Sequence, residues 1–126
     1  MKNSLTRNLG RLLMLLIVVL VASFAVTAWS GARTSATSVN IVNNSSRAIV
    51  NVYLSHVGAD DWGGNQLGNA TIGSGQSFNL TNVACDAQQI RVIGEDQDGC
   101  FVSTNVNCDQ GSTWTITNDT SRDCGQ

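Results

Sequence analysis

The sequence predicts an all-β protein, a small antiparallel β-sandwich of six to seven strands that follows an N-terminal export segment. Three observations support this prediction. Short runs rich in threonine, valine and isoleucine recur at about eleven-residue spacing from residue 39 onward, and such residues favour the strands of a sandwich. That region lacks the apolar periodicity of an amphipathic helix. All four cysteines lie in its C-terminal half, which is typical of an exported domain with disulfides.

Residues 1–32 are typical of a secretory signal peptide. Lys2, Arg7 and Arg11 precede residues 12–29, which are almost wholly apolar, and small residues follow. The alternative is an uncleaved signal anchor, because a helix over residues 12–29 would span roughly 27 Å, close to a bilayer core. The basic N-terminus predicts that the domain lies outside the inner membrane, periplasmic or secreted in the first case and anchored in the second. Membrane contact is expected only through residues 12–29 of an uncleaved signal.

The exported part of the chain is acidic. From Thr37 onward it has three arginines, no lysine and nine acidic residues, a net charge of −6, although the whole chain carries −2. Nucleic-acid binding depends on clustered lysine and arginine that neutralise phosphates. The composition therefore excludes a nucleic-acid partner and leaves an unidentified protein or small ligand.

The domain is expected to cover residues 39–126, after a polar spacer at residues 33–38. Strands are predicted at residues 39–43, 48–55, 76–80, 90–93, 101–102 and 113–117, with a further short strand at most at residues 71–72. Their number and spacing predict an immunoglobulin-like or similar sandwich. In the second strand, alternate positions are apolar on both faces, with Val52 and Leu54 on one face and Ile49 and Tyr53 on the other. Such a pattern favours a central strand.

The acidic run after Gly94 predicts a β-hairpin whose turn is centred just after Asp96. In that register Cys85 lies opposite Cys108, at a separation that a disulfide can bridge. Cys100 then remains for Cys124. The other two connectivities stay open, because spacing alone does not determine the pairing.

Several short motifs occur in a recognisable order. They are Tyr53-Leu54-Ser55, Asp61-Trp62-Gly63, Leu67-Gly68, Cys85 and Asp98-Gly99. This order resembles a group of small exported bacterial proteins with a Tyr-x-Ser … Trp-Gly-x-x-x-Leu-Gly … Cys … Asp-Gly layout, over about residues 51–108. The resemblance implies an exported compartment and a β fold, and it implies no activity.

The cysteines match this group only in part. Cys85 and Cys108 correspond to the cysteine pair of the group, which supports their pairing, whereas Cys100 and Cys124 look like an addition. Residues 87–89 are Ala-Gln-Gln, where the group often has an aromatic residue and an aspartate. A role for that acidic residue is therefore not carried over.

The loop after the second strand contains the candidate binding residues Trp62, Asp60, Asp61 and Asn65. Trp62 has two interpretations. As an anchor it would close one end of the sandwich, in the apolar company of Leu67. As a recognition residue it would stay exposed and stack on a sugar or peptide. The sequence favours the anchor. In the last strand, alternation predicts that Trp114 lies in the core.

No cofactor is predicted, and calcium is the alternative. Asp96 and Asp98 resemble the start of a calcium loop, because hard cations prefer clustered carboxylate oxygens. The glutamate that would complete such a loop is missing, with Asn107 nearest to its position. Asp60 and Asp61 form a second oxygen-rich place. Solvated turns are the simpler interpretation of both.

No catalytic residues are predicted. His56 is the only histidine, and Ser55 beside it is poorly placed to donate to it, because neighbours on a strand point to opposite faces. The function expected is a non-enzymatic binding or envelope-associated module with two disulfides. A calcium-dependent module and an inhibitor-like protein that presents the Trp62 loop are the alternatives.

Overall fold

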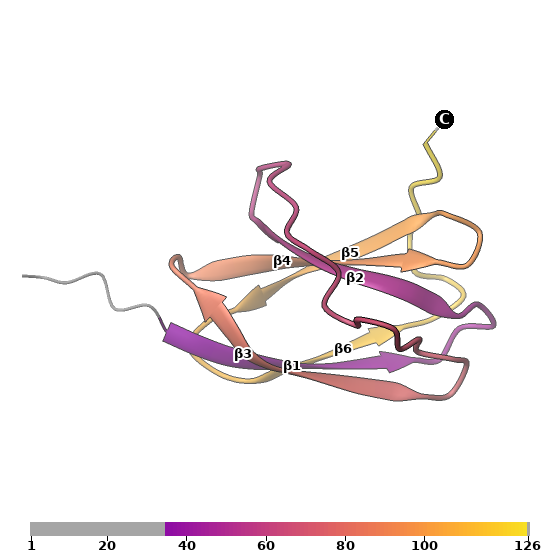
Figure 1. Ribbon diagram of the computed structural model, residues 1–126, viewed down its shortest axis with the longest axis horizontal. Coiled ribbons are helices and arrows are strands. Elements are labelled where there is room, and N and C mark those ends of the chain that lie inside the picture. Colours follow the sequence, from indigo (N-terminus) through magenta and orange to yellow (C-terminus); the bar gives the residue numbers. More distant parts are fainter. Residues whose placement is uncertain (1–34, 126) are drawn as a thin grey trace, which may run out of the picture. The chain divides into compact units, whose positions relative to one another are not determined.

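Two three-stranded sheets face each other in residues 35–125, the residues that the computed structural model describes. The strands are β1 (Ser35–Asn43), β2 (Ile49–His56), β3 (Ser77–Cys85), β4 (Gln89–Asp96), β5 (Phe101–Asn107) and β6 (Ser112–Ile116). The sheets have the strand orders β3-β1-β6 and β2-β4-β5 and form two layers (Figure 1). The predicted all-β sandwich is confirmed. The expected signal segment lies outside the described residues, and within residues 35–125 no helix is long and apolar enough to cross a membrane.

One pair of strands is not antiparallel. β1 runs antiparallel to β3 but parallel to β6, so this one pair departs from the predicted antiparallel arrangement. The chain leaves β5 in one sheet and turns directly into β6 in the other sheet (Figure 1). This change of sheet brings β6 back alongside β1 in the same direction.

Several strands extend beyond their predicted limits. β1 begins at Ser35, inside the expected spacer of residues 33–38. β3 continues past residue 80 and β5 continues past residue 102. The additional residues are largely polar and exposed, so they lack the apolar alternation from which the strands were predicted. Pairing of their backbones with neighbouring strands makes them strands.

The core lies between the sheets and consists of buried aliphatic side chains and one tryptophan. Trp114 is buried, as predicted. Gly94, just before the acidic run of the hairpin, pairs with Val52 and Val102 inside the sheet. A Cβ at Gly94 would lie 3.3 Å from Val102 Cγ2 and 3.6 Å from the Trp114 ring. Glycine at this position therefore lets the indole pack closely on the middle of β4.

β2 does not keep a strict alternation of faces. Its register against β4 shifts between Ile49 and Asn51, as at a β-bulge, which adds one residue to a strand. Ile49 and Val52, which were predicted on opposite faces, are both buried in the core for this reason.

β2 is an edge strand, so its predicted central position is wrong. The connection to β3 passes back along β2 before it reaches β3 (Figure 1) and supplies hydrogen bonds to the free edge. Leu54 O accepts from Gly63 N at 3.0 Å and Val52 O accepts from Gln66 N at 2.7 Å, while Val52 N donates to Asn65 Oδ1 at 3.0 Å. This connection makes β2 resemble a central strand, because it covers the edge and the outer face together.

The two predicted disulfides, Cys85–Cys108 and Cys100–Cys124, are both present. The hairpin register used to predict the first is wrong, because Val92 pairs with Thr104, which centres the turn on Asp98 and not just after Asp96. Cys85 ends β3 in the other sheet, so the Cys85–Cys108 disulfide links the two sheets instead of crossing a hairpin.

Candidate functional site

A hollow of about 570 Å³ opens at the end of the sandwich where β2 and β3 finish and β4 begins. Its apolar floor includes Leu54, Val83 and Ile90, which belong to the core or pack against it. Its rim is polar and includes His56, Asp61, Asp86, Gln66 and Asn82. A concave site with an apolar floor and a few convergent polar groups is the usual form of a small-ligand site.

His56 joins two acidic segments across the mouth of this hollow. It is opposite Ile90 in the β2–β4 register and therefore on the same face of the sheet as the floor. Its Nδ1 contacts Asp61 Oδ2, from the loop after β2, and its Nε2 lies 3.1 Å from both oxygens of Asp86, in the β3–β4 turn. All three side chains remain solvent-accessible, with exposed fractions of 55% for His56, 46% for Asp61 and 66% for Asp86. The imidazole therefore bridges two carboxylates at an accessible surface.

Asp61 is positioned by β2 itself. Its Oδ1 accepts hydrogen bonds from Ser55 Oγ at 2.8 Å and from the backbone N–H of His56 at 3.0 Å. Ser55 Oγ is also 2.9 Å from the carbonyl of Ala59. The serine is buried and directed at the loop, which confirms that it is poorly placed to donate to the imidazole. The arrangement holds a carboxylate and does not form a serine–histidine nucleophile pair, which requires a direct contact between the two side chains.

The His56–Asp61–Asp86 network stabilises the charged forms of His56 and Asp61. The Asp61 hydrogen bond is the largest cause that raises the pKa of His56 above its ordinary 6.5, and Asp86 adds to it. The His56 hydrogen bond, followed by that from Ser55, lowers the pKa of Asp61 from 3.8 to about 2. Both shifts favour an imidazolium between two carboxylates.

The stability that the network contributes decreases both at high pH and at low pH. The contribution of His56 is fully present below pH 6.5 and is lost as the pH rises through the raised pKa of the folded state. The contribution of Asp61 is present above pH 3.8 and is lost as the pH falls through about 2. The network is therefore strongest between about pH 4 and pH 6.5.

The Asp61→Asn variant is expected to lower the pKa of His56 toward 6.5, because the largest cause of the shift is removed. His56 is the only histidine, so its imidazole proton signals can be followed by NMR from pH 4 to pH 9 without assignment. Asp119→Asn, which removes an exposed carboxylate outside the hollow, should leave the His56 titration unchanged. A wild-type His56 that titrates at or below 6.5 would contradict the network.

A β-bulge shapes the rim on the side of β3. Thr81 and Asn82 of β3 lie against a single residue of β1, where the register shifts between Thr37 and Val39. Asn82 has a φ of 55°, the left-handed conformation that asparagine tolerates better than most residues. Bulges are frequent beside functional sites, where they redirect a side chain. Asn82 is one of two asparagines in β3, so the sequence alone does not indicate this feature.

The structure separates the four loop residues that were predicted together. Asp61 lines the hollow. Asp60 is exposed and lies outside the lining of the hollow. Asn65 accepts hydrogen bonds from Val52 N and Leu67 N and donates to Gly68 O at 3.1 Å. Its side chain thus holds the loop on β2, and the binding role of Asn65 stays a prediction.

Trp62 lies on the outer face of the β2-β4-β5 sheet. Its ring centroid is 5.6 Å from that of Tyr53 and 5.0 Å from that of Phe101, the second pair at an interplanar angle of 79°. Because Tyr53 and Phe101 belong to the two strands that flank β4, the indole lies across the outer face of β4. Ile93, opposite Tyr53 in the register, is fully buried although it lies outside the main core. The prediction that Trp62 closes one end of the sandwich is therefore wrong. Leu67 is part of the core, whereas Trp62 is 37% exposed and lies outside it.

The Trp62→Ala variant is expected to lose roughly 1–2 kcal/mol of unfolding free energy, below the about 3–5 kcal/mol of a fully buried tryptophan. The indole packs on Tyr53 and Phe101 but leaves part of its own surface in water. Urea unfolding measures the loss. Val57→Ala removes the other exposed large apolar side chain among the described residues and should change stability by less than about 0.5 kcal/mol. A loss above about 3 kcal/mol for Trp62→Ala would restore the anchor interpretation.

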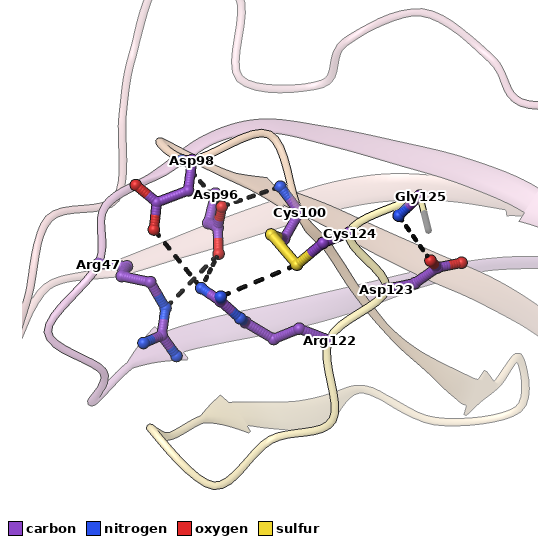
Figure 2. Close-up of a disulfide and its surroundings, with 8 residues drawn as sticks. All are labelled: Arg47, Asp96, Asp98, Cys100, Arg122, Asp123, Cys124 and Gly125. Atoms are coloured by element: carbon purple, nitrogen blue, oxygen red, sulfur yellow. Dashed lines mark hydrogen bonds and ion pairs between the residues drawn. A yellow bond between two sulfur atoms is a disulfide. The ribbon is translucent and has the colours of Figure 1, made fainter.

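The carboxylates proposed for calcium have other partners. Asp96 is almost fully buried. Its Oδ2 accepts a hydrogen bond from Arg122 Nη1 at 2.8 Å and lies 3.5 Å from Arg47 Nε. Its Oδ1 accepts from the backbone N–H groups of Asp98 and Cys100 (Figure 2). Two guanidinium groups thus supply the positive charge that the hypothesis assigned to calcium. In residues 35–125 no group of three or more histidine, cysteine or acidic side chains is arranged to hold a metal ion.

Comparisons with known proteins add little to this geometry. No family model matches the chain, and no curated protein matches it. Among solved structures, it is similar to one described as the NMR structure of the protein from Eubacterium rectale. That similarity has 18% identity, covers 71% of this chain and 84% of that chain, and has a TM-score of 0.45. No argument is based on so distant a similarity, and the resemblance to small exported bacterial proteins stays a prediction.

Proposed function

We propose that the protein is an exported, non-enzymatic binding module whose ligand is a small molecule held in the hollow at His56. The hollow carries this proposal, because it combines about 570 Å³ of space with an apolar floor and a polar rim. Cavities of about 300–1,000 Å³ with such a lining accommodate small organic ligands. Export is supported by the predicted signal segment and by two disulfides in a small domain.

The geometry around His56 favours binding over catalysis. Ser55 Oγ donates to Asp61 and is buried, and both imidazole nitrogens face carboxylates. A general base must have a nitrogen free to reach the proton that it abstracts. Holding a polar group of a ligand needs no such free nitrogen, because carboxylate oxygens accept several hydrogen bonds each.

The inhibitor-like alternative depends on Trp62 standing out from the surface. The indole instead lies against Tyr53 and Phe101 on its own sheet. A residue that is already packed in this way offers a partner only the remaining exposed part of its ring. The hollow is therefore the stronger candidate.

An NMR screen of the protein, purified in its exported and oxidised form, tests the proposal. A library of small organic compounds of mixed charge is expected to contain compounds that shift the backbone amide signals of Asn82, Asp86 and Ile90 in a saturable manner. Shifts confined to Tyr53, Trp62 and Phe101 would show that the ligand binds at these three aromatic side chains and not in the hollow. Recovery of the protein in the cytoplasmic fraction with free thiols would contradict export.

A further inference from the structure

We propose that the hollow at His56 selects small organic cations, compounds that carry an ammonium or guanidinium group on a short apolar body. This inference rests on the proposed function and adds the chemical class of the ligand. It follows from the distribution of charge around the rim, the accessibility of one carboxylate and the apolar floor.

The charged groups of the rim are two carboxylates and one imidazole. Asp61 and Asp86 flank His56, and no arginine or lysine lines the hollow in the part of the chain that the structure describes. Arg47 and Arg122 contact Asp96 at the opposite end of β4. The rim therefore has a net charge of −1 when His56 is protonated and −2 when it is neutral.

Asp86 is the carboxylate best placed to accept a ligand. Asp61 already accepts from Ser55 Oγ, from a backbone N–H and from the imidazole. Within residues 35–125, Asp86 has a polar side-chain contact with His56 alone, and it is 66% exposed. Each ionised carboxylate has about four lone-pair sites, so Asp86 can accept a cationic donor while it keeps His56.

The floor provides contact for an apolar body. Leu54 and Ile90 are partly buried and pack against the core, and both line the hollow. An alkyl or aromatic group placed there would cover apolar surface that water now covers, which is favourable. The six excess negative charges of the exported region further attract cations and repel anions at low salt.

Three probes with the same six-carbon body separate charge from apolar contact: hexylammonium, hexanol and hexanoate. They are titrated into the wild-type protein at low salt, and backbone amide signals of residues 82–90 are followed by NMR. Hexylammonium is expected to give saturable shifts with an affinity roughly tenfold above that of hexanol, and hexanoate is expected to give none. Hexylammonium affinity should also rise as the pH passes through the pKa of His56, because Asp61 and Asp86 are the charged groups that face it and deprotonation leaves them uncompensated.

Asp86→Asn keeps the size of the side chain and should weaken hexylammonium binding by about fivefold. Asp119→Asn removes the same charge from an exposed turn outside the hollow and should leave the affinity within about twofold, a difference too small to reflect a lost charge contact. Hexanol affinity equal to that of hexylammonium, or an unchanged affinity in Asp86→Asn, would overturn the choice of a cation and leave the proposed binding site in place. If none of the three probes shifts the signals of the hollow, the ligand class and the proposed site both fail.

Discussion

Replacing Asp96 by alanine is expected to lower the free energy of unfolding by about 3–5 kcal/mol. The side chain has 1% of its surface exposed and contacts Arg122 at 2.8 Å and Arg47 at 3.5 Å. It also accepts hydrogen bonds from the backbone N–H groups of Asp98 and Cys100, at 2.9 and 3.0 Å. Alanine would remove all four contacts and leave two half-buried guanidinium groups and two N–H groups without their acceptor, which costs more than losing a surface ion pair.

Asp98 provides the matched control for this prediction. It lies two residues away and contacts the same guanidinium at 3.5 Å, but 54% of its side chain is exposed. Asp98→Ala should therefore change stability by less than about 1 kcal/mol. Urea unfolding of both variants, in the presence of calcium and of EDTA, also tests the calcium hypothesis. Equal losses for the two variants would contradict the role of Asp96, and a calcium-dependent rise in wild-type stability would restore the metal site.

Removing the Cys85–Cys108 disulfide with the double variant Cys85→Ser, Cys108→Ser is expected to cost about 3 kcal/mol. The two cysteines are 23 residues apart, and releasing a loop of this length returns conformational entropy to the unfolded chain. Both cysteines are buried, and their disulfide joins the end of β3 to the end of β5. A loss below about 1 kcal/mol in urea unfolding would show that the unfolded chain is restricted in some other way.

The second disulfide separates this global effect from a local one. Cys100 and Cys124 are 24 residues apart, so removing them should relax the unfolded chain by nearly the same amount. Asp86 directly follows Cys85, whereas Cys100 lies beside Asp96 at the other end of β4 (Figure 2). Only the Cys85, Cys108 variant should therefore move the pKa of His56 toward its ordinary value. A shift of that pKa in both variants, or in neither, would contradict the placement of Asp86 by the first disulfide.

The strands that face the core could be predicted from the sequence, and the polar edges of the sheets could not. Trp114 alternates with polar residues and lies in the core, where the alternation placed it. The ends of β3 and β5 escaped prediction because their side chains are mostly exposed and only backbone pairing makes them strands. The disulfide pairing was predicted correctly from a register that is wrong, since Cys85 and Cys108 meet across two sheets.

Only part of the candidate site could be predicted from the sequence. The sequence indicates Asp61 as an acidic candidate in the loop and does not distinguish Asp86 from the other acidic residues. These two residues and His56 come from three separate segments, and their meeting depends on the crossing from β3 to β4 between the sheets. The fold gives His56 two carboxylate partners, Asp61 and Asp86. No spacing in the chain signals them, because residues 56 and 86 approach only through tertiary structure.

The sequence alone determined the all-β fold class and the burial of Trp114 in the core, and export stays a prediction from the sequence. These properties depend on composition and on alternation within short segments, which local physical chemistry governs. The tertiary structure alone decided that β2 is an edge covered by its own loop, that Trp62 lies on an outer face, and that Asp96 is a buried ion-pair acceptor. Each of these features depends on which distant segment of the chain packs against a residue. A pattern within a short segment of sequence does not indicate that segment.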